Sequence, residues 1–141
     1  EHVSVYPEGI GAAACFVLDE KGNVIESDVL AGETLILDSG VYTLDALKLV
    51  DGNFNPETLE HATWDNGGID VHIRQPILRT LKKQGGDDFA VVTVDDIDRV
   101  IRLGAASGEY TLRVAGYEVD LSPLLEKYRE RYAAWIANNI I

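Results

Sequence analysis

The last third of the chain, residues 109–141, constrains the fold most. Two short alternating segments, 110–114 and 117–121, flank an Ala-Gly pair, and this pattern predicts a β-hairpin. A Ser-Pro pair follows, which suits the cap and the first turn of a helix. Apolar side chains then recur at helical spacing up to about Ala137, so we expect the helix to cover one face of the hairpin. These side chains are Leu125, Tyr128, Tyr132, Trp135 and Ile136.

The first third predicts a β-meander. Residues 10–50 divide into short apolar runs separated by Gly, Asn and Asp, which is typical of about four antiparallel strands in a meander or a small barrel. We expect the first strand at Ala12–Leu18 and the longest at Val41–Val50, with a bend or a bulge before Leu47. Cys15 lies among small apolar residues of the first run, so we expect it to be buried.

The middle of the chain is less regular. Residues 51–68 combine Pro, several Asn and a Gly pair, so we interpret them as an irregular loop. After it, Ile69–Ile73 predicts a strand, 76–84 a short helix, and Phe89–Val92 another strand.

A further helix is predicted after residue 92. Thr93 and the carboxylate three residues later fit a capping box, and Gly104 is the expected end of this helix. The whole pattern predicts one α+β domain. Its parts are an extended arm at 1–9, the meander at 10–50, the loop at 51–68, and an α/β segment with a C-terminal amphipathic helix at 69–141.

The negative charge lies in one half of the chain. Residues 1–73 contain 14 acidic side chains and two lysines, whereas residues 74–141 contain ten acidic and ten basic side chains. This layout argues against direct nucleic-acid binding, which needs a basic surface. No apolar run approaches the length of a membrane span, which is about 20 residues.

Four possible metal ligands fall within twelve residues: His61, Asp65, Asp70 and His72. Their spacing fits no established zinc pattern, so a polar loop with a strand histidine is the favoured interpretation. Two acidic groups, Asp87-Asp88 and Asp95-Asp96-Asp98, could hold a cation or act as acid and base. A structural role is favoured, because Asp95 and Asp96 lie in the first turn of an expected helix, where the helix dipole favours negative charge.

Phosphate-binding motifs are also missing from the sequence. Neither a GxGxxG loop nor a GxxxxGK[ST] loop occurs, so the motifs give nucleotide binding almost no support. We therefore expect no cofactor, no bound metal and no catalytic residues.

Several residues are candidates for protein contacts instead. A basic cluster falls within ten residues, and an acidic surface is its natural partner. Trp64 lies in the polar loop, where an exposed Trp would anchor an interface. The N-terminal arm could add a strand to a neighbour's sheet. The candidates are Val3, Val5, Trp64, Arg74, Arg79, Lys82 and Lys83.

These observations favour a non-enzymatic structural or assembly subunit that contacts other copies of itself, such as a virion or surface-filament component. The alternative is an acidic inhibitor or immunity-type protein that covers a basic site on its partner. An enzyme or a small-ligand module near His61–His72 is a third possibility. The chain lacks Met and starts at Glu1, which we interpret as proteolysis or the choice of expressed segment. Proteolytic processing would fit a virion or extracellular location.

Overall fold

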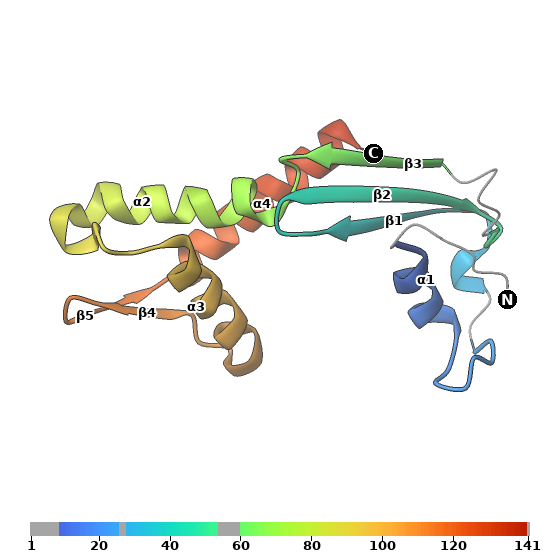
Figure 1. Cartoon of the computed structure of the whole chain (residues 1–141), viewed down its shortest axis with the longest axis horizontal. Helices are drawn as coiled ribbons and strands as arrows, with labels where there is room; N and C mark the ends of the chain where they lie inside the picture. The colour runs from blue at the N-terminus through green and yellow to red at the C-terminus, as the bar shows by residue number, and fades with distance from the viewer. Residues whose placement is uncertain (1–8, 26–27, 54–59, 141) are drawn as a thin grey trace, which may run out of the picture. The chain divides into compact units, whose positions relative to one another are not determined.

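A computed structural model describes residues 9–25, 28–53 and 60–140, and it confirms a mixed α+β fold (Figure 1). The chain divides into two units, Glu1–Gly68 and Ile69–Ile141. Within the described ranges, no helix is long and apolar enough to cross a membrane.

Unit 1 is a sheet with a helix on one face. Strands β1 (Glu33–Ser39), β2 (Thr43–Val50) and β3 (Glu60–Asp65) pair antiparallel in that order. Helix α1 (Gly9–Val17) packs against β1 and β2, and the short helix η1 (Asp28–Leu30) precedes β1 (Figure 1). Burial of apolar side chains between helix and sheet stabilises this unit. Its core comprises Ala13, Val17, Leu30, Leu47 and Leu49.

The first predicted strand is wrong, because Ala12–Leu18 lies almost entirely in α1. A short run of apolar residues has no readable period, and its three consecutive alanines favour a helix. Among the described residues, the end of this run forms one isolated β-bridge, between Leu18 and Val24. Cys15 is exposed rather than buried, because the sheet covers the face of α1 that carries Ala13 and Val17.

The meander lies later in the chain than predicted. It runs from β1 to β3, so the expected irregular loop at 51–68 contains a strand, Glu60–Asp65. Most side chains of β3 are exposed. Its sequence is therefore mostly polar and lacks the apolar alternation that would have predicted a strand. The predicted bulge in β2 is also wrong, since the pairing with β1 is continuous from Glu33–Val50 to Ser39–Leu44.

Unit 2 packs three α-helices, two shorter helical segments and a β-hairpin around one core. The pairing of the hairpin and the helix that follows it were both predicted. The elements are η2 (Asp70–Arg74), α2 (Gln75–Gly85), η3 (Gly86–Phe89), α3 (Val94–Ser107), β4 (Thr111–Val114), β5 (Tyr117–Asp120) and α4 (Ser122–Asn139).

The hairpin and α4 confirm the prediction for the C-terminal third. Ala115 and Gly116 both have positive φ, 48° and 82°, as a tight hairpin turn requires. Leu125, Tyr128 and Tyr132 of α4 are buried in the core of unit 2. This apolar stripe is the one that the helical spacing predicted.

Helix α3 begins with the predicted capping box. The hydroxyl of Thr93 accepts a hydrogen bond from the Asp96 backbone, and the Asp96 carboxylate accepts one from the Thr93 backbone. The helix ends at Ser107 instead of Gly104, because Gly108 is the residue that adopts the left-handed conformation. Gly104 instead makes room for the ring of Tyr110, which would lie 2.2 Å from an added Cβ.

Two predicted strands in unit 2 are helical turns. Ile69–Ile73 leads through the π-helical η2 into α2, and Phe89–Val92 follows from η3 into a turn. Phe89 and Val92 are both buried. Since they lie three residues apart, a turn brings both to the same side, which a strand would not.

Candidate functional site

In unit 1, strands β1 and β2 form a hairpin whose turn lies between Ser39 and Thr43. A polar patch lies at this end of the sheet. Directly paired residues of antiparallel strands share a face, and the register places Asp38 opposite Asp45 and Thr63 on the other side of Asp45. Thr43 and Asp65 form the next pair on this face, toward the turn. We call these five residues the polar end.

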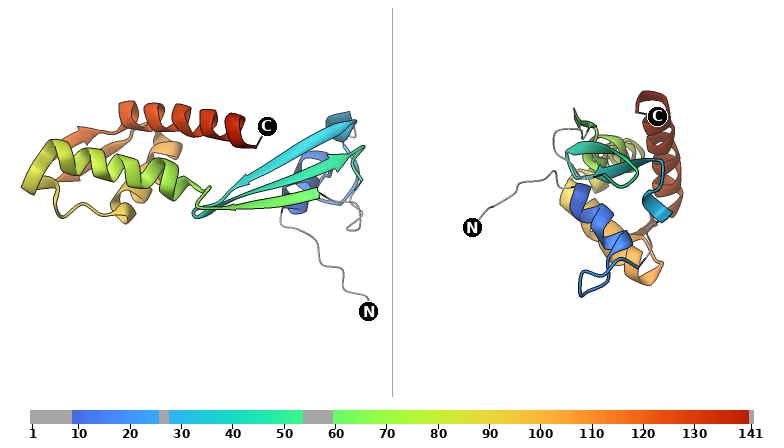
Figure 2. Two further views of the ribbon diagram at one scale, coloured as in Figure 1. Left: turned by 90° about the horizontal axis from the view of Figure 1, so that it is seen from above. Right: turned by 90° about the vertical axis from the view of Figure 1, so that its right-hand side faces the viewer.

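The same face is apolar further along the strands, where α1 covers it. Ile36 and Leu47 form the pair next to Asp38 and Asp45, and both pack in the core under α1. The face therefore changes from apolar at the Ile36–Leu47 pair to polar at the neighbouring Asp38–Asp45 pair. The hairpin lies at one end of the sheet and α1 lies further along it (Figure 2).

Asp45 is held in place by hydroxyl groups. Thr43 Oγ1 donates to one carboxylate oxygen of Asp45 at 3.1 Å, and Thr63 Oγ1 donates to the other. Asp38 and Asp45 are both half-buried and directly opposite each other. Like charges in such a pair are destabilising, and a cation between them would remove the repulsion.

The first turn of α1 lies beside the polar end. A Cβ added to Gly9 would lie 3.6 Å from Leu47 and 3.7 Å from Ile36, the pair adjacent to Asp38 and Asp45. The described first turn of α1 contains no acidic side chain. The N-terminus of a helix carries a partial positive charge and free N–H groups, which favour an anion.

Gly67 and Gly68 pack closely against the turn between β1 and β2. The backbone N–H of Gly68 donates to the carbonyl of Tyr42 at 3.1 Å. A Cβ on Gly68 would lie 2.5 Å from the carbonyl oxygen of Val41, so a side chain there does not fit. A Cβ on Gly67 would lie 2.9 Å from Leu44 Cβ.

The polar end combines carboxylate and hydroxyl oxygens with a helix N-terminus. Oxygen ligands are those that Mg²⁺ prefers, and Mg²⁺ is usually held by one or two carboxylates together with phosphate oxygens. Within the described part of the chain, no group of three or more His, Cys, Asp and Glu side chains could hold a metal by itself.

Sequence reasoning missed this site, although a signal for it was present. Asp38-Ser39-Gly40 was correctly interpreted as a chain reversal between two strands, but β3 was not predicted. Once the two strands are aligned around Gly40, residues 38, 43 and 45 fall on one face.

The four possible metal ligands belong to different units. His61 and Asp65 are exposed on β3 in unit 1, whereas Asp70 and His72 lie on η2 in unit 2. Asp70 forms an ion pair with Arg74. The ring of His72 lies 4.9 Å from that of Tyr132 and 4.4 Å from that of Trp135 (centroid distances).

One residue of the predicted basic cluster, Arg74, is not available for contacts at the surface. Arg74 is buried, and its guanidinium faces the carboxylates of Asp70, Asp95 and Asp98 at 3.5–3.9 Å. Arg79, Lys82 and Lys83 are exposed on α2.

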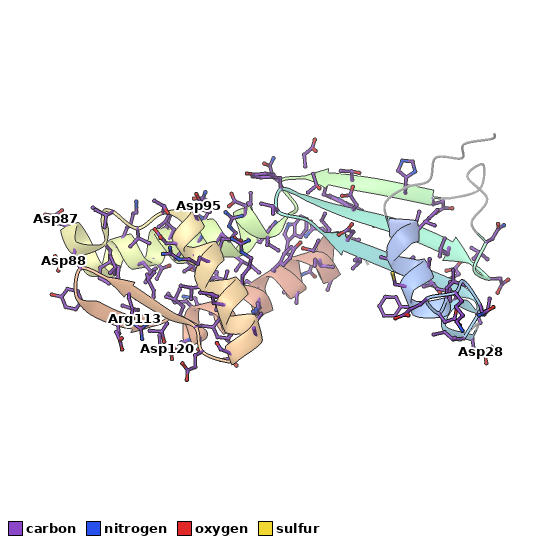
Figure 3. All side chains as sticks on the ribbon, turned by 60° about the horizontal axis from the view of Figure 1, so that its bottom comes forward. Asp28, Asp87, Asp88, Asp95, Arg113 and Asp120 are labelled. Carbon is purple, nitrogen blue, oxygen red and sulfur yellow. The ribbon has the colours of Figure 1, made fainter. Side chains whose placement is uncertain are left out.

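The acidic groups near helix starts have separate positions. Asp87 and Asp88 lie in the turn after α2, and Asp95 lies at the start of α3 (Figure 3). Asp96 belongs to the capping box, and hydrogen bonds from the Thr93 side chain and backbone lower the pKa of its carboxyl group.

The other contact candidates lie in unit 1. Trp64 is half-buried on β3, directly opposite Leu44. Val3 and Val5 lie outside the described residues.

Comparison with known proteins establishes the fold. No protein-family model and no curated protein sequence matches the chain. The solved structure of the actin-like protein Alp7A is similar over 95% of this chain, with a TM-score of 0.64 and 17% identity. Bacillus thuringiensis ParM is similar over 94%, with a TM-score of 0.57 in its apo form and 0.60 with ATP, at 13% and 16% identity.

The fold is actin-like. The chain spans between 36% and 38% of the length of these three structures, so it corresponds to little more than a third of each. At these identities the similarity establishes the actin-like fold and no more.

The predicted function needs correction. An actin-like fold contradicts both the virion or surface-filament component and the alternative, an acidic inhibitor or immunity-type protein. The classification as a viral protein is wrong for the same reason. Composition and charge could not reveal this, because they do not depend on the pairing of the strands.

Proposed function

We propose that this chain is part of an actin-like protein of the cytoskeletal type that binds ATP with Mg²⁺ and self-associates. The observation that carries the proposal is the match of nearly the whole chain, both units included, to ParM and Alp7A. One of these ParM structures contains ATP.

The polar end of unit 1 is the proposed contact for the phosphates and their metal ion. Its residues fit such a ligand, since Asp38 and Asp45 are directly paired carboxylates that would hold the cation. The N-terminus of α1 beside them would attract the phosphate groups. Bound Mg²⁺ would neutralise charge on the phosphates.

The residues around this contact have distinct tasks. Thr43 and Thr63 orient the carboxylate of Asp45 through their hydroxyl groups. Gly68 allows the close approach of the backbone that fixes the hairpin turn. We also propose that this chain is not an enzyme by itself, and that groups from the remainder of an actin-like protein would be needed for hydrolysis.

Self-association is the second part of the proposal. Unit 1 contains 13 acidic side chains and two lysines, a net charge of −11, whereas unit 2 contains 11 acidic and ten basic side chains. Separated charge of this kind favours contacts between copies, and the actin-like fold is compatible with them. This fold also favours a cytoplasmic location over the virion or extracellular location that the sequence suggested.

Nucleotide binding can be measured with Trp64, which lies opposite Leu44 on the strand next to the hairpin. In a Trp135→Phe variant, Trp64 is the remaining tryptophan of the chain. We expect its emission to change on titration with ATP and Mg²⁺. Asp45→Asn should weaken this binding by more than roughly tenfold, since it removes one of the two carboxylates that would hold the metal.

The matched control is Glu20→Gln, which removes one exposed negative charge from unit 1 away from the polar end. It should leave the affinity within about twofold of the parent, an effect typical of a distant surface charge. If equilibrium dialysis finds no binding of ATP with Mg²⁺ to the parent chain, nucleotide binding by this chain is ruled out; an unchanged Trp64 emission alone does not rule it out, since Trp64 lies on the other face of the sheet from Asp45. Equal losses in both variants would place the nucleotide elsewhere.

A further inference from the structure

A basic groove lies between α2 and α4 in unit 2. It has a volume of about 390 Å³. The two helices pack against each other, and two residues of η2, Val71 and His72, also line the groove. The residues that line it are Val71, His72, Pro76, Arg79, Thr80, Lys83, Tyr128 and Arg131.

The floor of the groove is fixed by a contact between the two helices. The hydroxyl groups of Thr80 and Tyr128 form a hydrogen bond of 2.7 Å, and Thr80 also donates to the carbonyl of Pro76. Arg131 lies over the ring of Tyr128, with 5.6 Å between its guanidinium carbon and the ring centroid. The groove is therefore held by packed side chains.

The rim of the groove is cationic. Arg79, Lys83 and Arg131 are all exposed, and no carboxylate lines the groove in the described part of the chain. Among the described residues, none of these three forms an ion pair. By contrast, Arg99 and Arg102 each lie within 2.9 Å of a carboxylate oxygen.

The spacing of these charges suits a surface better than a single small anion. Arg79 and Lys83 are four residues apart on α2, so they follow one side of the helix with a rise of about 6 Å. Arg131 lies on the facing helix α4. Charges distributed along two helices match an acidic protein surface, whereas a small anion needs donors that converge on one point.

We propose that this groove binds the acidic unit 1 of a second copy of the chain. The inference rests on the self-association in the proposed function and names its two surfaces. Unit 1 carries a net charge of −11. One of its two lysines, Lys48, is already paired with Glu33 at 3.0 Å, which raises the pKa of Lys48. Because each copy presents both surfaces, the contact continues from copy to copy.

Adjacent lysines provide a matched test. Lys83 lines the groove, and Lys82 on the same helix lies outside it. Each substitution, Lys83→Glu or Lys82→Glu, changes the net charge equally. In sedimentation velocity over a concentration series, Lys83→Glu should weaken self-association by roughly tenfold, and Lys82→Glu by much less.

Crosslinking then identifies the partner surface. A mixture of ¹⁴N- and ¹⁵N-labelled chains is treated with a carbodiimide, which joins a lysine amine to a carboxylate in direct contact. We expect mixed-isotope peptides that link Lys83 to carboxylates of residues 1–68. Links confined to one copy, or links from Lys83 only to unit 2, would overturn the proposal.

The outcomes separate this inference from the proposed function. A parent chain that stays monomeric at every concentration overturns both self-association and the groove contact. A parent chain that self-associates, with equal effects of Lys82→Glu and Lys83→Glu, overturns the groove contact alone. Binding of ATP is measured independently and is unaffected by either result.

Discussion

Arg74 Nε lies 3.5 Å from Asp70 Oδ1, one helical turn earlier, in the interior of unit 2. The Arg74 side chain is 9% exposed, and its Nε makes no hydrogen bond within the described residues. Charge attraction therefore holds the pair. Asp98 Oδ1 lies 3.9 Å from Arg74 Nη1, so the guanidinium joins η2 to α3.

Replacement of Arg74 by Met should destabilise unit 2 by about 3 kcal/mol, because it leaves the largely buried Asp70 carboxylate without its cation. Urea unfolding followed by Trp135 fluorescence in a Trp64→Phe background measures this free energy. The control is Arg102→Met, which removes an exposed arginine that also pairs with Asp98, and it should cost less than about 1 kcal/mol. Equal costs would contradict a stabilising role for the buried pair.

The capping box of α3 should make a measurable contribution to stability. Thr93→Ala removes the hydroxyl that accepts from the Asp96 backbone N–H, and the expected loss is about 1–2 kcal/mol. Thr93→Ser keeps an oxygen at the same place and serves as the control. Unfolding of unit 2, measured by the same Trp135 signal, should distinguish the two variants.

The Asp96 carboxyl group predicts a dependence on pH. Its pKa is lowered from 3.8, chiefly by the hydrogen bond from the Thr93 side chain. A lowered pKa in the folded state contributes stability above pH 3.8 that is lost as the pH falls below that value. In Asp96→Asn, the unfolding midpoint of unit 2 should therefore fall less between about pH 4 and pH 2 than in the parent.

Two glycine substitutions should have opposite effects on unit 1. Gly68→Ala places a Cβ 2.5 Å from the Val41 carbonyl oxygen, so the hairpin must shift, at a cost of about 2 kcal/mol. Gly11→Ala lies within α1 with no atom within 4 Å of the new Cβ, and it should stabilise the helix by up to about 1 kcal/mol. Trp64 fluorescence during unfolding, in the Trp135→Phe background, measures both.

Cys15 should react with a thiol reagent in the native protein, because its side chain is exposed on α1. Modification by dithionitrobenzoate without denaturant should proceed at a rate close to that in urea. A slow native reaction that accelerates only on unfolding would show that Cys15 is protected.

Sequence patterns predicted unit 2 better than unit 1. In the hairpin and α4, several local signals agree: the alternation, the turn and the Ser-Pro start all point to the same structure. The Thr93 capping box was predicted for the same reason. The apolar run at Ala12–Leu18 lacks such agreement, so its assignment as a strand rested on its apolar residues and on the turn residues that follow it.

The candidate site was missed because it depends on pairing. Asp45 is one acidic residue among many in the sequence, and it becomes distinctive once Asp38 and Thr63 lie on either side of it. The exposed, polar strand β3 carries no hydrophobic signal of its own. Likewise, Arg74 resembled the exposed bases around it, since the carboxylates that enclose it come from η2 and α3.

Strand β2 has a consequence for how unit 1 would respond to a ligand. Asp45 at the polar end and Leu47 under α1 are two residues apart on one face of this strand. A ligand that draws Asp38 and Asp45 together would change the twist of the same backbone segment on which α1 rests. The packing of α1 on β2 would then change when a ligand binds at the polar end. Slower amide hydrogen exchange in α1 on ligand binding would be the measurable sign of this coupling.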